Sequence, residues 1–216
     1  MSNSKITTLL FDLDGTLINT NELIIQSFRH TFATHGLQVT DEEIYRYFGQ
    51  PLHDQFALFA PGQEEQLIAT YRQFNSDMHD QLTQGFPGID ALLAELEQRG
   101  YRLGIVTSKI RPIVLRGLQL FNLERYFELL VCAEDTDKHK PHPAPVQKAL
   151  ELFGVDNQAA AMVGDSPYDL LAAKAAGVTA IGVLWSSFPR ESLEECDPHH
   201  LVENPGGLLE LFPPLS

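Results

Sequence analysis

Near the start of the chain, residues 6–17 read ITTLLFDLDGTL, a mainly apolar run followed by two aspartates and a glycine. The run from Ile6 to Phe11 lacks the alternation of a strand with one face in water, so it predicts a strand buried on both faces of a parallel sheet. Asp12 and Asp14 come directly after it. Aspartate ahead of glycine is common in turns, but two carboxylates this close together also predict a nearby cation.

Four more short apolar runs follow this pattern, and segments with helical spacing lie between them. The runs are Leu103–Val106, Leu129–Cys132, Ala159–Val163 and Ala180–Trp185. The helical segments are Ile89–Arg99, which ends before a C-capping Gly100, and then Ile113–Phe121, Val146–Phe153 and Leu170–Ala176. Repeated strand and helix in this order predicts an α/β fold with a parallel sheet and right-handed crossovers.

One interval breaks this repeat. More than seventy residues separate Asp12 from Ile89, far more than a simple crossover needs. Asn21–His35 and Gln63–Leu82 are amphipathic, and Thr40 precedes three acidic residues as an N-cap would. We therefore predict an all-helical domain inserted at residues 18–83, between the core segments 1–17 and 84–216.

Composition restricts the function classes. The 216 residues include 15 Lys+Arg and 29 Asp+Glu, a formal net charge of −14. This balance argues against a nucleic-acid partner or an anionic membrane surface. No run approaches the length of a membrane span and no signal peptide is evident. Cys132 and Cys196 are expected to be reduced thiols, so we expect a cytoplasmic protein. We expect it to be a monomer or a dimer.

Polar clusters follow the predicted strands at three further places. Thr107-Ser108-Lys109 follows the second run, Lys138-His139-Lys140-Pro141 lies in the loop after the third, and Asp165 to Asp169 follows the fourth. Ligands of open α/β sheets bind outside the carboxyl ends of the strands, so these clusters are expected to converge. Each also has a structural alternative: a helix cap at Thr107 and Ser108, an exposed loop lysine, and a capping box from Ser166 to Asp169.

Together these residues suit phosphoryl transfer through an aspartyl-phosphate. Asp12 would attack phosphorus, and Asp14 would protonate the leaving oxygen and then activate water. Asp12 and Asp165 would hold Mg²⁺, a hard cation that prefers oxygen ligands. The remaining role, holding the phosphate oxygens, would fall to Thr107, the Ser108 amide and Lys140.

The four clusters resemble the four motifs of the haloacid dehalogenase superfamily. The segments that carry the resemblance are Phe11–Leu17, Ile105–Lys109, Lys140-Pro141 and Val163–Asp169. The resemblance spans the chain and implies a Rossmann-like core with a helical cap and an obligate Mg²⁺. It also implies that the Asp14 backbone carbonyl binds the metal, and that Asp169 supports or joins the metal site.

Within the superfamily the chain is similar to the phosphoglycolate-phosphatase-like branch, and in particular to its bacterial inorganic pyrophosphatases. Residues 12–25 and 104–107 carry this likeness, although many relatives have Asp where this chain has Asn19. The resemblance implies a small anionic phosphate substrate. Candidate substrate contacts in the cap are Asn21, Glu22, Gly49, Pro51 and His53.

Other functions remain open on the sequence. Pyrophosphate is the expected substrate, with phosphoglycolate or a small sugar phosphate as alternatives. A β-phosphoglucomutase-like phosphotransferase would share Asp12, Asp14 and Mg²⁺. A dehalogenase needs neither Mg²⁺ nor Asp14, and a receiver-like switch lacks an acid beside its aspartyl-phosphate, so Asp14 argues against both.

Overall fold

The computed structural model describes residues 5–48 and 50–215 and divides into two compact units. The larger unit is Met1–Asn19 with Gly85–Ser216, and the smaller is Thr20–Gln84. The chain passes between them at β2 (Ile18–Asn19) and β3 (Gln84–Gly85), which form a two-stranded sheet. In the described part of the chain, no helix is both long and apolar enough to cross a bilayer.

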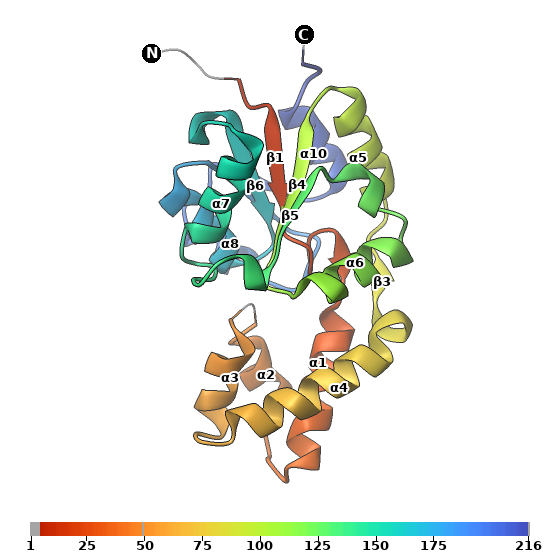
Figure 1. The fold of residues 1–216 in the computed structure, drawn as a ribbon, viewed down its shortest axis with the longest axis vertical. Coiled ribbons are helices and arrows are strands. Elements are labelled where there is room, and N and C mark those ends of the chain that lie inside the picture. Colours follow the sequence, from red (N-terminus) through yellow and green to blue (C-terminus); the bar gives the residue numbers. More distant parts are fainter. Residues whose placement is uncertain (1–4, 49, 216) are drawn as a thin grey trace. The chain divides into compact units, whose positions relative to one another are not determined.

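The larger unit is built on a six-stranded parallel sheet in the order β5-β4-β1-β6-β7-β8 (Figure 1). The strands are β1 (Thr8–Phe11), β4 (Arg102–Val106), β5 (Leu129–Val131), β6 (Ala160–Gly164), β7 (Thr179–Val183) and β8 (His200–Val202). The predicted α/β class is confirmed, and the first five strands lie within two residues of their predicted bounds. The edge strand β8 was missed because its sequence, His200-Leu201-Val202, has only two apolar residues and forms no apolar run.

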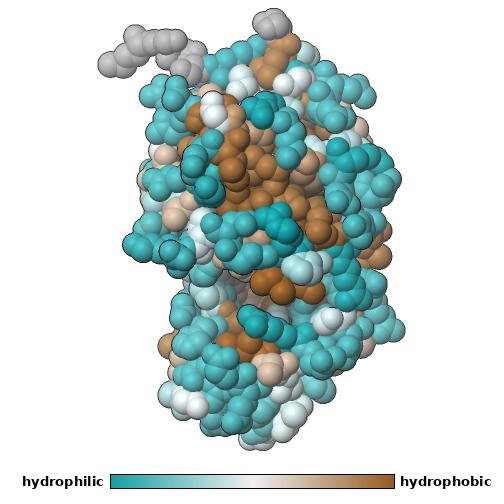
Figure 2. All heavy atoms as spheres, viewed as in Figure 1, coloured by the Kyte–Doolittle hydropathy of each residue, from teal (hydrophilic) through white to brown (hydrophobic). Residues whose placement is uncertain are grey.

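Helices cover both faces of this sheet because successive strand residues point to opposite sides. Leu9 and Phe11 of β1 belong to one hydrophobic cluster and Leu10 to the other. The first cluster includes side chains of α5 (Ile89–Gln98), α6 (Arg111–Leu120) and α10 (Pro205–Leu211). The second includes those of α7 (Ala144–Phe153), α8 (Pro167–Ala176) and α9 (Arg190–Glu194). Hydrophobic side chains gather in the middle of the larger unit in Figure 2, with hydrophilic ones around them.

Short turns complete the larger unit. Gly100, just after α5, has φ +89°, and its amide donates to the Glu97 carbonyl, as its predicted capping role requires. Single turns of 3₁₀-helix are found at η1 (Glu124–Tyr126), η2 (Ala133–Asp135) and η3 (Asn157–Ala159).

The smaller unit is helical, with α1 (Asn21–Thr34), α2 (Asp41–Tyr45), α3 (Leu52–Phe59) and α4 (Glu64–Leu82). Thr40 is the N-cap of α2, as the sequence predicted, and it also forms a capping box with Glu43, whereas α3 was not predicted. Phe28 of α1 packs against Phe56 of α3 and Tyr71 of α4, with ring centroids 5.3 and 4.9 Å apart. Each such buried aromatic ring contributes about 1.5–3 kcal/mol of apolar burial, so this cluster is the unit's own core.

Candidate active site

The polar residues that follow β1, β4 and β6 lie at one edge of the sheet. Phe11, the last residue of β1, is in register with Ile105 of β4 and Val163 of β6. Asp12 therefore sits between the ends of these two strands, and its amide donates to the Val163 carbonyl at 2.9 Å. Thr107 and Asp165 directly follow β4 and β6. The convergence expected from the sequence is present in the parallel register.

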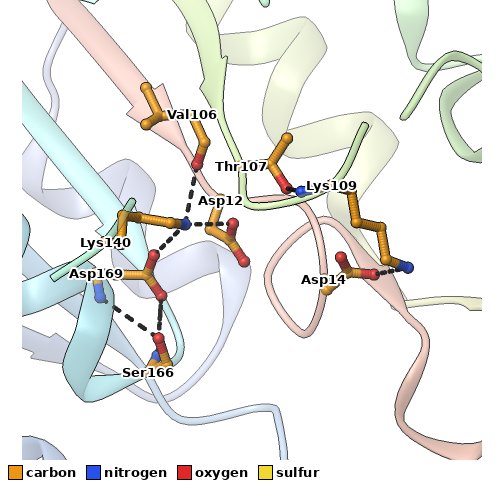
Figure 3. Close-up of polar contacts among 8 residues, drawn as sticks. All are labelled: Asp12, Asp14, Val106, Thr107, Lys109, Lys140, Ser166 and Asp169. Atoms are coloured by element: carbon orange, nitrogen blue, oxygen red, sulfur yellow. Dashed lines mark hydrogen bonds and ion pairs between the residues drawn. The ribbon is translucent and has the colours of Figure 1, made fainter. Parts of the chain in front are cut away.

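Lys140 joins these strand ends from the loop before α7. Its Nζ donates to Oδ1 of Asp12 at 2.7 Å, to Oδ1 of Asp169 at 2.6 Å and to the Val106 carbonyl at 3.0 Å (Figure 3). These three acceptors use all three N–H donors of the ammonium. The side chain is only 5% exposed, so Lys140 is not a surface loop lysine.

Asp169 is held on both carboxylate oxygens. Its Oδ1 accepts from Lys140, and its Oδ2 accepts from the Ser166 hydroxyl at 2.6 Å and the Ser166 amide at 3.2 Å. The predicted capping box at the start of α8 is thus present, and the same aspartate also anchors Lys140. The structural and functional interpretations of Asp169 are therefore compatible.

Burial shifts the protonation of this cluster. Burial raises the pKa of Asp12 to about 7, and the Asp169 and Asp14 charges add to the rise while Lys140 opposes it. Burial also raises the pKa of Asp165 well above its ordinary value, helped by Asp169 and Asp12 and opposed by a Ser186 hydrogen bond. Burial alone would lower the pKa of Lys140, but Asp12 and Asp169 outweigh it and raise that pKa.

The donor set fits a hard divalent cation. Asp12, Asp165 and Asp169 each offer a carboxylate oxygen, and these oxygens lie within 4.8 Å of one another in a buried site. With Lys140, three carboxylates and one ammonium carry a formal charge of −2 when ionised, which a divalent cation would neutralise. A Cβ at residue 15 would lie 2.0 Å from Oδ2 of Asp165, so only glycine permits this approach of the loop to the carboxylate. The site can therefore bind a metal ion.

Asp14 lies apart from the Lys140 cluster and pairs with a different lysine. Nζ of Lys109 is 2.7 Å from Oδ1 of Asp14, and Figure 3 shows the pair on the other side of Asp12 from Lys140. The Lys109 amide donates to Oγ1 of Thr107 at 3.2 Å. The alternative that Thr107 or Ser108 caps the next helix is wrong, because Ile110 occupies the N-cap of α6.

The remaining predicted site residues are Ser108 in the larger unit and several candidate substrate contacts in the predicted cap. Ser108 is exposed beside Thr107. Asn21 and Glu22 open α1 in the smaller unit, where Oε1 of Glu22 accepts from Gln26 at 2.7 Å. Pro51 precedes α3 and His53 lies within it, whereas Gly49 is outside the described residues. Their role as substrate contacts stays a prediction.

Two residues that contact carboxylates of the site, Ser186 and Lys109, were not given these contacts by the sequence analysis. Ser186 follows β7 and hydrogen-bonds the Asp165 side chain. Lys109 was expected near the cleft as one of its basic residues, with no contact to Asp14 assigned. A signal for Ser186 was available, since it lies just beyond the end of a fifth parallel strand, where ligand-binding residues gather.

Comparison with known proteins identifies the family. Residues 9–183 match the family model described as haloacid dehalogenase-like hydrolase. The chain belongs to this family. Its six-stranded parallel sheet is thus that of a haloacid dehalogenase-like hydrolase.

Relatives of this hydrolase match nearly its whole length. A Caldanaerobacter subterraneus protein named "Putative pyrophosphatase PpaX" is 46% identical, covering 96% of this chain and 95% of its own. Pyrophosphatase PpaX of Bacillus pumilus is 44% identical, covering 98% of each chain. A crystal structure from Lactobacillus plantarum, described as a "putative phosphoglycolate phosphatase", has a TM-score of 0.86 at 30% identity, covering 96% of this chain and all of that one.

Proposed function

We propose that this hydrolase is a Mg²⁺-dependent inorganic pyrophosphatase that works through a phosphorylated Asp12. The observation that carries the substrate assignment is the 44% identity, across 98% of both chains, to a protein named pyrophosphatase PpaX. The core geometry supports the chemistry, because a nucleophilic carboxylate, a second carboxylate and a buried lysine lie at one sheet edge.

Asp12 and Asp165 would hold the metal ion. Asp169 is engaged on both oxygens by Lys140 and Ser166, so we assign it the role of orienting that lysine beside the metal ligands. When bound, Mg²⁺ supplies positive charge that lets an anionic carboxylate approach an anionic phosphoryl group.

In the first step an Asp12 oxygen forms a bond to phosphorus as the bond from phosphorus to the bridging oxygen breaks. Asp14, protonated at that stage, gives its proton to the leaving phosphate. Lys140, the Thr107 hydroxyl and the Ser108 amide stabilise the charge on the transferring phosphoryl oxygens. The carboxyl group of Asp12 is then an acyl-phosphate.

In the second step water attacks the phosphorus of that acyl-phosphate and Asp14 accepts its proton. The bond between phosphorus and the Asp12 oxygen breaks, which releases inorganic phosphate and restores the carboxylate. Each turnover consumes one water and produces two phosphates. Asp14 ends protonated, ready for the next substrate.

We assign the smaller unit, the predicted cap of residues 18–83, to substrate selection, with Asn21 and Glu22 as candidate contacts. We also expect a cytoplasmic enzyme, because Cys132 and Cys196 are free thiols. Phosphoglycolate is the second candidate substrate, favoured by the structural match to the Lactobacillus plantarum protein.

The test is Mg²⁺-dependent phosphate release from pyrophosphate, phosphoglycolate and a panel of sugar phosphates, with Asp12→Asn as control. We expect pyrophosphate to lead in kcat/KM by about tenfold or more, a transition-state preference of about 1.4 kcal/mol. A carbon phosphate in the lead would overturn the substrate and leave the core mechanism intact. Full activity in Asp12→Asn would overturn the mechanism.

A further inference from the structure

Lys109 forms an ion pair with Asp14 in the candidate active site. Its Nζ is 2.7 Å from Oδ1 of Asp14, the carboxyl group to which we assign protonation of the leaving oxygen. We infer that Lys109 binds the leaving group and selects phosphoryl donors whose leaving group is itself an anion. This inference rests on the proposed function, since it takes from it the role of Asp14.

The two lysines of the site differ in how their donors are used. All three N–H donors of Lys140 already have acceptors in the protein, so Lys140 acts on the phosphoryl oxygens through its positive charge and not through an unused donor. Within residues 5–48 and 50–215, the Lys109 ammonium has the Asp14 carboxylate as ion-pair partner and no further acceptor. An ammonium has three N–H donors, so Lys109 keeps donors for a second anion beside Asp14.

The backbone of Lys109 lies close to the end of β4. It follows the last residue of β4 by three positions, and its amide is tied to the Thr107 hydroxyl at 3.2 Å. The Lys109 side chain as a whole is 19% exposed, close to the 20% of Asp14, but its Nζ atom is buried, so the ion pair is screened from water. A charge-assisted hydrogen bond to a ligand is stronger in such a place than on an open surface.

The distances suit an anion attached close to the leaving oxygen. A leaving oxygen within hydrogen-bond reach of Asp14 would lie about 3 Å from the Asp14 carboxylate. Nζ of Lys109 lies at a similar distance, 2.7 Å, from the same carboxylate. Pyrophosphate carries terminal oxygens one bond beyond the phosphorus of the leaving group. Phosphoglycolate carries a carboxylate a little further out, whereas phenyl phosphate has a leaving group with no charge outside the departing oxygen.

A purely structural role for Lys109 makes a different prediction. If it only orients Asp14, its loss would slow protonation of every leaving group that needs a proton, whatever the charge beyond the leaving oxygen. The two roles therefore separate when substrates with charged and uncharged leaving groups are compared in the same variant.

The experiment compares Lys109→Met, which removes the charge, with Lys109→Arg, which keeps it, in the full-length enzyme with Mg²⁺. Lys148→Met is the matched control, since Lys148 also pairs with a carboxylate, Glu151 at 3.0 Å, but on the surface of α7. Substrates are pyrophosphate, phosphoglycolate and phenyl phosphate. Far-UV circular dichroism and the melting temperature check that each variant is folded.

In Lys109→Met we expect kcat/KM for pyrophosphate to fall about tenfold or more relative to phenyl phosphate, with partial recovery in Lys109→Arg. Methylenediphosphonate, a non-hydrolysable analogue of pyrophosphate, should lose affinity as an inhibitor of phenyl phosphate hydrolysis by a similar factor, while inorganic phosphate does not. Lys148→Met should match the unmodified enzyme. Equal losses for pyrophosphate and phenyl phosphate, or unchanged binding of methylenediphosphonate, would overturn the inference.

The experiment distinguishes failure of the proposed pyrophosphatase function from failure of the inference about Lys109. The substrate ranking of the unmodified enzyme tests pyrophosphate against phosphoglycolate, and either of these anionic leaving groups is compatible with the role of Lys109. If phosphoglycolate leads and Lys109→Met impairs it selectively, the pyrophosphate assignment fails and the inference holds. If pyrophosphate leads and Lys109→Met lowers kcat/KM for all substrates by the same factor, the pyrophosphate assignment holds and the inference fails.

Discussion

Nζ of Lys140 lies 2.7 Å from Oδ1 of Asp12, although 128 positions separate the two residues in the chain. Both side chains are buried at the carboxyl edge of the sheet. A buried carboxylate without a counter-charge is costly, so the lysine both orients Asp12 and makes its ionised form tolerable inside the protein. The contact therefore links the stability of the core to the reactivity of the proposed nucleophile.

Replacing Lys140 by Met should damage stability and rate together. Breaking a buried ion pair by removing one partner typically costs about 3–5 kcal/mol, because the remaining carboxylates are left uncompensated. We expect a loss in the free energy of unfolding approaching that range in urea titrations, and a fall in kcat of about 100-fold or more. The surface variant Lys148→Met should change the free energy of unfolding by less than about 0.5 kcal/mol. Equal stabilities of the two variants would contradict the buried role of Lys140.

Asp14→Asn should slow turnover while leaving the nucleophile in place. An amide can neither donate a carboxyl proton to the leaving group nor accept one from water, and such proton transfer contributes about 10²–10⁴-fold. Steady-state phosphate release should fall by that order. With an activated donor such as acetyl phosphate, whose leaving group needs no proton, radiolabelled phospho-enzyme should accumulate in Asp14→Asn and be absent from Asp12→Asn. Unchanged steady-state turnover in Asp14→Asn would remove its acid–base role.

Removal of Mg²⁺ should lower the melting temperature of the protein more at high pH than at low pH. In the folded protein without metal, burial raises the pKa of Asp12 to about 7, above the value of about 4 for an unfolded chain. The stabilising contribution of the protonated form is then complete below about pH 4 and is lost as the pH rises through about 7. Mg²⁺ binds the ionised carboxylates, so it offsets this loss. The rise in melting temperature caused by Mg²⁺ should thus be larger at pH 8 than at pH 5.

The control for this measurement is Asp165→Asn, which removes one proposed ligand and one buried charge. Its melting temperature should respond less to Mg²⁺ at pH 8 than that of the unmodified protein. A Mg²⁺ response that is equal at both pH values would contradict the link between the metal and these carboxylates.

Much of the site could be predicted because its polar residues lie in short segments that directly follow the strands. Asp12, Thr107 and Asp165 each follow an apolar strand directly, so the parallel register alone brings them to one edge. The difference between Lys140 and Lys109 could not be predicted, since both lie in polar clusters and only the fold determines their partners. One is enclosed by three acceptors and the other faces Asp14.

The elements that escaped prediction are those with little local signal. β8 has only two apolar residues, and its strand conformation depends on pairing with β7, which the sequence of the segment does not reveal. The contact between Ser186 and Asp165 likewise depends on how the loop after β7 approaches the end of β6. The position of Ser186 beyond a predicted strand placed it near the edge of the sheet, but serine is common in loops, so its residue type did not identify Asp165 as its partner.

Ser186→Ala should weaken metal binding. The Ser186 hydroxyl hydrogen-bonds the Asp165 side chain, and this bond opposes the rise in the pKa of that carboxyl group. Residues that orient a metal ligand typically contribute a factor of about 10–100 to metal affinity, so we expect Mg²⁺ affinity measured by calorimetry to fall by about tenfold. Ser186→Thr keeps the hydroxyl and should retain most of the affinity. Ser187→Ala, at the exposed neighbouring position, is the matched control and should bind Mg²⁺ normally. If Ser186→Ala binds Mg²⁺ as tightly as Ser187→Ala, the serine does not orient Asp165 for the metal.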